Sequence, residues 1–272
     1  MEVSLFIGCI NDVFYPRVGT AAVKVLRELG VRVHFPEDQS CCGQAHFNSG
    51  YWDEAARLAR HFCRVFGAGL PVVTPAGSCA AMVNEVYGQL LGEGRRTLPV
   101  PRVWEFSEFL VARMGVDRWE GYFPARAVLH VSCHTLRWVP QGARAAKTLL
   151  ESVKGLSMEP FADWDRCCGF GGTFAVKAPE LSVALADEKL DRMMAAGAQL
   201  VISSDTSCLM HLMGRARRRG LPLRFAHVAE VLAEARGLLA PQAEGAERAP
   251  KAAALPGSQG TRPLRTRKEA AS

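Results

Sequence analysis

The sequence predicts an α/β protein made of two pseudo-symmetric repeats, each with a parallel sheet at its core. Two observations lead to this fold class. The cysteines recur along the chain at a nearly constant spacing, and short apolar runs alternate with longer segments of helical periodicity. Strands that alternate with helices form parallel sheets, since each helix returns the chain to the edge where the next strand begins.

The repeat is defined by eight of the nine cysteines. The first half contains Cys9, then Cys41-Cys42-Gly43, then Ser78-Cys79, and the second half contains Cys133, then Cys167-Cys168-Gly169, then Ser207-Cys208. Corresponding cysteines are 124, 126 and 129 residues apart. The remaining cysteine, Cys63, shares one face of a predicted helix with apolar residues, so we expect it in the core.

The predicted elements follow the same order in each repeat. In the first repeat, the pattern predicts a strand at 3–7, a helix at 21–29, a strand at 31–35, a helix at 51–66 and a strand at 71–74. In the second repeat, it predicts a strand at 127–131, a helix at 143–153, a weaker strand at 156–158, a helix at 179–196 and a strand at 199–203. The first helix of each repeat ends at a glycine, Gly30 or Gly155, as helices commonly do.

The cysteines follow the carboxyl ends of these strands, where open α/β sheets bind their ligands. Cys79 and Cys208 also open helices, where backbone N–H groups and the helix dipole stabilise a thiolate. We therefore expect three cysteine loops of each half to converge on one edge of its sheet.

Adjacent cysteines indicate the kind of ligand. A structural zinc site usually has cysteines separated by two to four residues, and neither half contains Cys-x-x-Cys, because Met82 and His211 stand at the last position. Adjacent thiolates suit a multi-iron cluster better, since each can hold a different metal atom, and each half supplies four cysteines. Zinc binding and thiol–disulfide chemistry stay open as alternatives at this point.

Other residues give weaker signals. His134 and His211 would each bind metal, protonate a bound group or only line the site. His227 is expected to cap the last helix or to contact a partner, and His61 is expected to be structural. The Gly-rich turn at 169–172 lacks the spacing of a nucleotide-binding loop. No paired-carboxylate or Ser-His-Asp pattern stands out, and this favours electron transfer over substrate chemistry on this chain.

Composition and charge argue against a membrane protein and against a nucleic-acid-binding protein. Apolar residues make up 49% and charged residues 22% of the 272 positions, which are ordinary values for a globular protein. The uncharged stretch at 66–83 contains glycines and prolines, so we expect no integral membrane segment, and with no signal peptide we expect a cytoplasmic location. Half of the net charge of +6 lies in a tail at 239–272, which is predicted to be disordered and not to bind nucleic acid.

These motifs resemble a known family. The duplicated Cys…Cys-Cys-Gly…Cys pattern is similar to the cysteine-rich "CCG" domain found in heterodisulfide reductases and in the iron–sulfur subunit of glycolate oxidase. Longer stretches, Thr74-Pro75-Ala76-Gly77-Ser78-Cys79 and Cys167-Cys168-Gly169-Phe170-Gly171-Gly172 among them, resemble the lactate-utilisation protein A family over about residues 1–236.

The resemblance implies a domain organisation and a set of ligands. It implies one CCG repeat at 1–120, a second at 121–238 and a tail outside both. It also implies iron–sulfur clusters, one or two and expected to be of the 4Fe–4S type, with zinc as an alternative in one repeat. The implied ligands are Cys9, Cys41, Cys42 and Cys79 in one site and Cys133, Cys167, Cys168 and Cys208 in the other.

The resemblance also implies a role. The chain would be an electron-transfer subunit of an oxidoreductase complex that oxidises L-lactate to pyruvate, rather than a complete enzyme. Its partners would be a ferredoxin-type iron–sulfur protein and a third, smaller subunit. The alternatives are a subunit of a glycolate oxidase or heterodisulfide-reductase-like complex, or a zinc-stabilised assembly scaffold. The family's full pattern ends each repeat in Cys-x-x-Cys, from which this chain departs at Met82 and His211.

Overall fold

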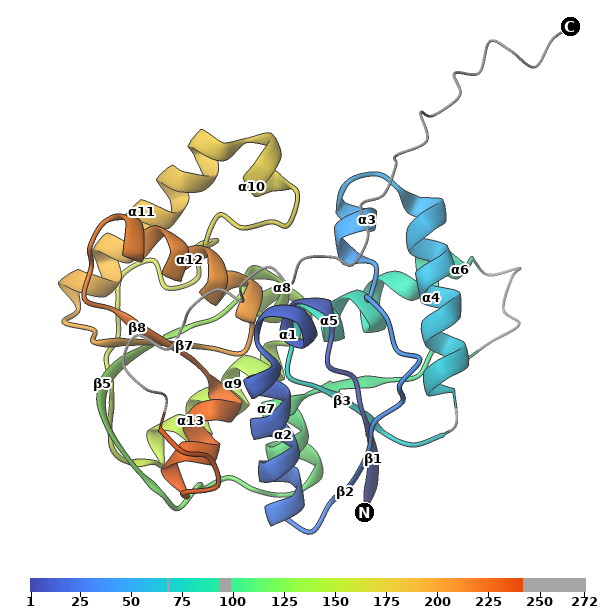
Figure 1. Ribbon diagram of the computed structural model, residues 1–272, viewed down its shortest axis with the longest axis horizontal. Coiled ribbons are helices and arrows are strands. Elements are labelled where there is room, and N and C mark those ends of the chain that lie inside the picture. Colours follow the sequence, from blue (N-terminus) through green and yellow to red (C-terminus); the bar gives the residue numbers. More distant parts are fainter. Residues whose placement is uncertain (68, 93–98, 242–272) are drawn as a thin grey trace, which may run out of the picture. The chain divides into compact units, whose positions relative to one another are not determined.

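Two four-stranded parallel sheets with the same strand order form the framework of the protein (Figure 1). The structure is a computed structural model that describes residues 1–67, 69–92 and 99–241. One sheet has the order β2-β1-β3-β4 and the other β6-β5-β7-β8. All strand pairs in both sheets are parallel. The predicted α/β fold with two pseudo-symmetric repeats is confirmed.

The elements of the two repeats correspond one to one over most of their length. The strands are β1 (Glu2–Leu5), β2 (Arg32–His34), β3 (Val72–Thr74), β4 (Val103–Glu105), β5 (Tyr122–His130), β6 (Lys154–Met158), β7 (Leu200–Ser203) and β8 (Arg224–His227). The first repeat has the helices α1 (Cys9–Phe14), α2 (Pro16–Glu28), α3 (Gln44–Asn48), α4 (Trp52–Phe66), α5 (Gly77–Ala81), α6 (Tyr87–Leu91) and α7 (Phe106–Glu108) and two π-helical turns, η1 (Met82–Val86) and η2 (Phe109–Arg113). The second repeat has α8 (Cys133–Trp138), α9 (Pro140–Glu151), α10 (Phe174–Lys177), α11 (Pro179–Ala195), α12 (Thr206–Arg218) and α13 (Val228–Ala235).

The predicted strands and helices are all present, with shifted ends. Helix α2 begins at Pro16 and α9 at Pro140, earlier than the apolar pattern indicates. Proline fits the first helical turn because its missing N–H has no partner there in any case. The edge strands β4 and β8 and the short helices α1 and α8 were not predicted, because such short segments carry little periodicity.

The two repeats pack against each other through equivalent helices in exchanged roles. Helix α1 contacts α12, and its counterpart α8 contacts α5. In the same way α2 contacts α13, and α9 contacts α7. Each contact therefore has a mate in which the two repeats are swapped, which is the signature of a pseudo-two-fold axis.

The largest hydrophobic cluster belongs to both repeats at once. It includes Val3 and Leu26 from the first repeat and Leu149 and Val231 from the second. Trp119, in the connecting segment, is completely buried there, and its indole Nε1 donates a hydrogen bond to the carbonyl oxygen of Leu232 at 2.9 Å. The two repeats thus share this largest core cluster.

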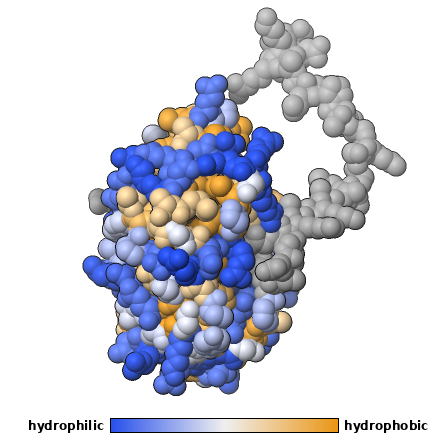
Figure 2. Space-filling model, turned by 90° about the vertical axis from the view of Figure 1, so that its left-hand side faces the viewer, coloured by the Kyte–Doolittle hydropathy of each residue, from blue (hydrophilic) through white to orange (hydrophobic). Residues whose placement is uncertain are grey.

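Cys63 lies in a smaller cluster of the first repeat, packed on α4, where it is buried as predicted. Within the uncharged stretch at 66–83, the described residues include the end of α4, then β3, α5 and the first residues of η1. Among the described residues, no helix combines the length and apolarity needed to cross a membrane. Figure 2 shows one face of the molecule, where hydrophilic side chains surround smaller hydrophobic areas. The predicted tail lies outside the described residues from position 242 onward.

Candidate metal centre

All eight cysteines of the repeat pattern line one cavity of about 160 Å³. The cavity lies where α1 and α5 of the first repeat meet α8 and α12 of the second. Each cysteine follows the carboxyl end of a strand, so the strand order of each sheet brings three loops together. The two predicted ligand sets therefore face a common space. Cys63 lies elsewhere, in the core of the first repeat.

The first set is built from the start of α1, the loop after β2 and helix α5. The Sγ atom of Cys9 lies 3.5 Å from the Sγ atom of Cys41. The backbone N–H of Gly43 donates to the Sγ atom of Cys41 at 3.4 Å. Gly43 has a φ of +83°, in the left-handed region that favours glycine, and this turn aims its N–H at the sulfur.

The second set repeats this arrangement. The backbone N–H of Gly169 donates to the Sγ atom of Cys167 at 3.3 Å. Gly169 has a φ of +90°, and a Cβ atom there would lie 2.4 Å from the carbonyl oxygen of Ser182, so only glycine fits. Gly171 and Gly172 of the Gly-rich turn also line the cavity.

Electrostatics single out one thiol in each set as the acidic one. Hydrogen bonds from the thiols of Cys42 and Cys9, together with the Gly43 N–H, lower the pKa of Cys41. Hydrogen bonds from Cys133 and Cys168 and from the Gly169 N–H lower the pKa of Cys167 in the same way. Each repeat thus stabilises a thiolate at the first cysteine of its Cys-Cys pair, and thiolate is the form that binds metal.

The other cysteine of each pair is buried and holds its proton more tightly. The thiols of Cys42 and Cys168 both have a raised pKa. In each case the thiol donates a hydrogen bond to its acidic neighbour, Cys41 or Cys167, and burial adds to the effect. Metal binding at either set would release these protons.

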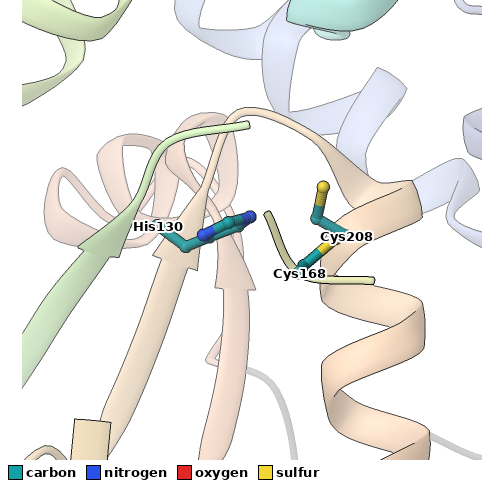
Figure 3. Close-up of side chains that lie close together, drawn as sticks. All are labelled: His130, Cys168 and Cys208. Carbon is teal, nitrogen blue, oxygen red and sulfur yellow. The ribbon is translucent and has the colours of Figure 1, made fainter. Parts of the chain in front are cut away.

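A histidine that sequence reasoning missed lies beside the second set. His130, the last residue of β5, is completely buried. A ligand atom of its ring and the sulfurs of Cys168 and Cys208 all lie within 4.8 Å of one another. Figure 3 shows the ring pointing toward these two sulfurs. Burial lowers the pKa of His130 to about 3, so the imidazole is neutral, as a metal ligand must be.

The predicted histidines have different roles. His134 lines the cavity, and its Nδ1 lies 3.5 Å from the Sγ atom of Cys133. His211 lies beside Ser182, with 3.2 Å between its Nε2 and the serine Oγ. His227 caps α13, because its Nδ1 accepts a hydrogen bond from the backbone N–H of Ala229, as predicted. His61 contacts the carbonyl oxygen of Asp38 at 2.6 Å, a structural role.

A second residue that the sequence did not single out connects the two repeats at the cavity. Asp205, just before α12, is buried and accepts hydrogen bonds from the backbone N–H of Ser78 at 3.1 Å and from its hydroxyl. It also accepts a hydrogen bond from the Thr135 hydroxyl at 3.2 Å. Its carboxylate therefore holds the cysteine helices α5 and α8 in place from the second repeat.

The donor set fits an iron–sulfur centre or a thiolate-bound metal ion. Thiolates are the usual ligands of iron–sulfur clusters and also bind zinc. Four sulfurs of each set line the cavity, and the backbone N–H groups of Gly43 and Gly169 stabilise their charge. The lining of this cavity thus has the chemistry of a metal centre.

Comparison with known proteins supports this assignment. The family model of the cysteine-rich domain matches residues 3–84 and 127–213, once in each repeat. The protein is thus one of the class built from two cysteine-rich domains.

Relatives narrow the class further. Lactate utilization protein A of Halalkalibacterium halodurans is 41% identical over 237 residues, which cover 85% of this chain and 96% of that protein. Lactate utilization protein A 1 of Bacillus mycoides is 42% identical over 242 residues, covering 87% and 98%. The chain belongs to the lactate utilization protein A family.

The fold also resembles a solved structure. A hypothetical protein from Helicobacter pylori aligns with a TM-score of 0.59 at 9% sequence identity. The alignment covers 87% of this chain and 49% of the other. At this identity the likeness concerns the fold alone.

Proposed function

We propose that the chain is an iron–sulfur electron-transfer subunit of a cytoplasmic complex that oxidises L-lactate to pyruvate. The observation that carries the proposal is the convergence of eight cysteines from two repeats on one cavity. The names of its relatives supply the substrate. Its partners would be a ferredoxin-type iron–sulfur protein and a third, smaller subunit.

The cavity residues would have three roles: binding the clusters, offsetting ligand charge and connecting the repeats. Cys9, Cys41, Cys42 and Cys79 would hold one centre, and Cys133, Cys167, Cys168 and Cys208 the other. An iron–sulfur cluster, of the 4Fe–4S type, would accept and donate single electrons there. The N–H groups of Gly43 and Gly169 would offset negative charge on the ligands. The carboxylate of Asp205 would hold the two ligand-bearing repeats together.

The test is metal analysis and reduction by lactate. We expect anaerobically purified protein to contain iron and sulfide, and its clusters to be reduced when lactate and both partner subunits are present. Replacing Cys167→Ser should lower the iron content by about half if each repeat holds one cluster, whereas Cys63→Ala should leave it unchanged, because Cys63 lies outside the cavity. Protein without iron, or clusters that lactate does not reduce, would contradict the proposal.

A zinc-stabilised scaffold is the second candidate, and the mixed set of His130, Cys168 and Cys208 favours it. In that case the protein would contain zinc in place of iron. Cys167→Ser would then unfold the protein, since structural zinc contributes directly to folding. In the electron-transfer case the same variant would stay folded and lose turnover in the assembled complex. A glycolate oxidase or heterodisulfide-reductase-like complex is distinguished by which substrate reduces the clusters.

A further inference from the structure

The two repeats differ in the residues that lie behind their cysteines. His130 precedes Cys133 by three residues in the second repeat, and Phe6 precedes Cys9 by three residues in the first. Phe6 is fully buried and packs edge-on against Phe62, with their ring centroids 4.9 Å apart. The first repeat therefore places hydrocarbon where the second places an imidazole.

A second pair of equivalent positions also differs in polarity between the two repeats. Helices α4 and α11 begin at Trp52 and Pro179, and the eleventh residue of each is Phe62 and Lys189, respectively. The aromatic pair of the first repeat thus becomes a histidine and a lysine in the second. Lys189 is buried, and its Nζ donates hydrogen bonds to the carbonyl oxygens of Trp164 and Arg166. It thereby holds the chain that leads into Cys167 and Cys168.

His130 itself has no visible structural use. Both of its ring nitrogens are buried and have no hydrogen-bond partner within the part of the chain that the structure describes. A neutral imidazole carries one donor and one acceptor, and leaving such groups unpaired in the interior is unfavourable. A buried polar group of this kind calls for an explanation, and a bound metal ion is one.

The side chains that surround His130 suit a metal atom. Its ring, the Cys168 thiol and the Cys208 thiol come from three separate elements and approach within 4.8 Å of one another (Figure 3). With Zn–S distances of about 2.3 Å and Zn–N distances of about 2.0 Å, two donors of one tetrahedral metal ion lie about 3.6–3.8 Å apart. The three donors lie within about 1 Å of that spacing, and side-chain rotations would complete the approach.

We infer that His130 is a nitrogen ligand of the metal centre in the second repeat, together with Cys168 and Cys208. The inference deepens the proposed function and rests on it, since it requires that the cavity hold metal. The two repeats then carry chemically different centres, one bound by sulfur alone and one bound by sulfur and imidazole. The metal atom is either one iron of a cluster or a single zinc ion, because both accept this donor set.

The difference in ligands has a consequence for electron flow. Replacing thiolate by neutral imidazole raises the reduction potential of an iron–sulfur centre, as in Rieske proteins. If both centres contain iron, the second repeat is the one that accepts electrons more readily. An electron arriving at the cavity would then settle on the side of His130.

The experiment detects nitrogen bound to the metal directly. The full chain is loaded anaerobically with Fe²⁺ and sulfide, and a second sample is loaded with Zn²⁺ alone. Pulsed electron paramagnetic resonance on the reduced iron sample, with and without ¹⁵N-labelled histidine, should show one strongly coupled histidine nitrogen. X-ray absorption on the zinc sample should show mixed nitrogen and sulfur ligation.

Variants identify which histidine is bound. His130→Phe, which copies the first repeat, should abolish the nitrogen coupling and weaken metal binding by at least about tenfold. His134→Phe is the matched control, since His134 also lies at the cavity, and it should keep the coupling. If His130→Phe does not fold, His130→Gln is measured instead, and the ¹⁵N label in the unmodified chain still reports any bound histidine.

The outcomes separate this inference from the proposed function. A metal centre with sulfur ligands only, or a nitrogen signal that survives in the His130 variants, overturns the inference and leaves the proposed function standing. A signal lost in His134→Phe in place of His130→Phe also overturns it. A chain that binds neither iron nor zinc overturns both.

Discussion

At the scale of single residues, Asp205 shows how one buried carboxylate connects the two repeats beside the cavity. It has no counterpart in the first repeat, because Ala76, which precedes Gly77 as Asp205 precedes Thr206, carries no polar group. Gly77 itself lies so close to Thr135 that a Cβ atom would clash with the threonine hydroxyl. The backbone of α5 can therefore approach the second repeat and donate to Asp205 directly.

Replacing Asp205→Ala should lower the free energy of unfolding by about 2–4 kcal/mol. The substitution leaves the half-buried Ser78 N–H and hydroxyl without their acceptor and removes one partner of the buried Thr135 hydroxyl, and an unpaired buried group costs roughly 1–3 kcal/mol before the structure relaxes. Denaturant unfolding measures the change. The control is Asp191→Ala, which removes an exposed ion pair with Arg219 and should cost less than about 1 kcal/mol. Equal effects of the two substitutions would contradict this role.

At the scale of elements, the last helix of each repeat begins at a buried ionisable residue. Glu105 caps α7 by accepting a hydrogen bond from the backbone N–H of Glu108, and His227 caps α13. Burial raises the pKa of Glu105 to about 8 and lowers the pKa of His227 to about 4. Both residues are therefore neutral near pH 7, and their caps work without charge.

Glu105 and His227 each make the free energy of unfolding depend on pH. Between about pH 4.5 and 6.5 their effects oppose each other, because unfolding lets His227 take up a proton and Glu105 release one. Between pH 6.5 and 8 the folded protein keeps a proton on Glu105 that the unfolded chain has lost, so Glu105 lowers the free energy of unfolding as pH rises, whereas the acidic thiols of Cys41 and Cys167 act in the opposite direction. At about 1.4 kcal/mol per pKa unit the contribution of Glu105 is about 2 kcal/mol across this window. Glu105→Gln should remove that contribution, so the difference in free energy of unfolding between the variant and the unmodified chain should change by about this amount in unfolding experiments at pH 6.5, 7.2 and 8.

Glu151→Gln provides the comparison for that experiment. Glu151 is exposed at the end of α9 and pairs with Lys147, so its replacement by glutamine disturbs neither the core nor a helix cap. Its replacement should leave the pH dependence of the free energy of unfolding unchanged. A Glu105→Gln protein with the same pH profile as the unmodified chain would show that Glu105 ionises normally.

The long elements and the convergence of the eight cysteines could be predicted from the sequence, whereas the place of His130 beside them does not show in the pattern of a single repeat. Helix α4 and strand β7 each have the periodicity or apolarity of their type over enough residues to be recognised. His130 sits at the end of such an apolar strand, and its place beside Cys168 depends on a loop some forty residues further along the chain. An alignment of the two repeats does reveal His130, because this polar residue corresponds to the apolar residue Phe6 of the first repeat.

At the scale of the whole molecule, the shared core makes the repeats dependent on each other. The first repeat buries α2 under α13 of the second repeat, and the second buries α9 under α7 of the first. Each repeat alone would leave an apolar helix face in water, at about 25 cal/mol per Å² of exposed apolar surface.

The chain divided after residue 120 tests this dependence. Circular dichroism should show a cooperative thermal transition for the whole chain and none for either half by itself. Mixing or co-expressing the halves should restore that transition, because the exchanged helix contacts can then form. A first half that unfolds cooperatively by itself would contradict the prediction.

The pseudo-two-fold packing of the helices also explains how the two repeats can differ from each other beside the cavity. Two identical single repeats could associate through the same contacts, α1 with α12 and α8 with α5, as a symmetric homodimer with one cavity on its axis. Every substitution in such a dimer would appear twice, so Phe6 and His130 could not coexist at equivalent positions. Joining both repeats in one polypeptide lifts that constraint, and it lets one cysteine set have a hydrocarbon side chain behind it and the other a nitrogen donor.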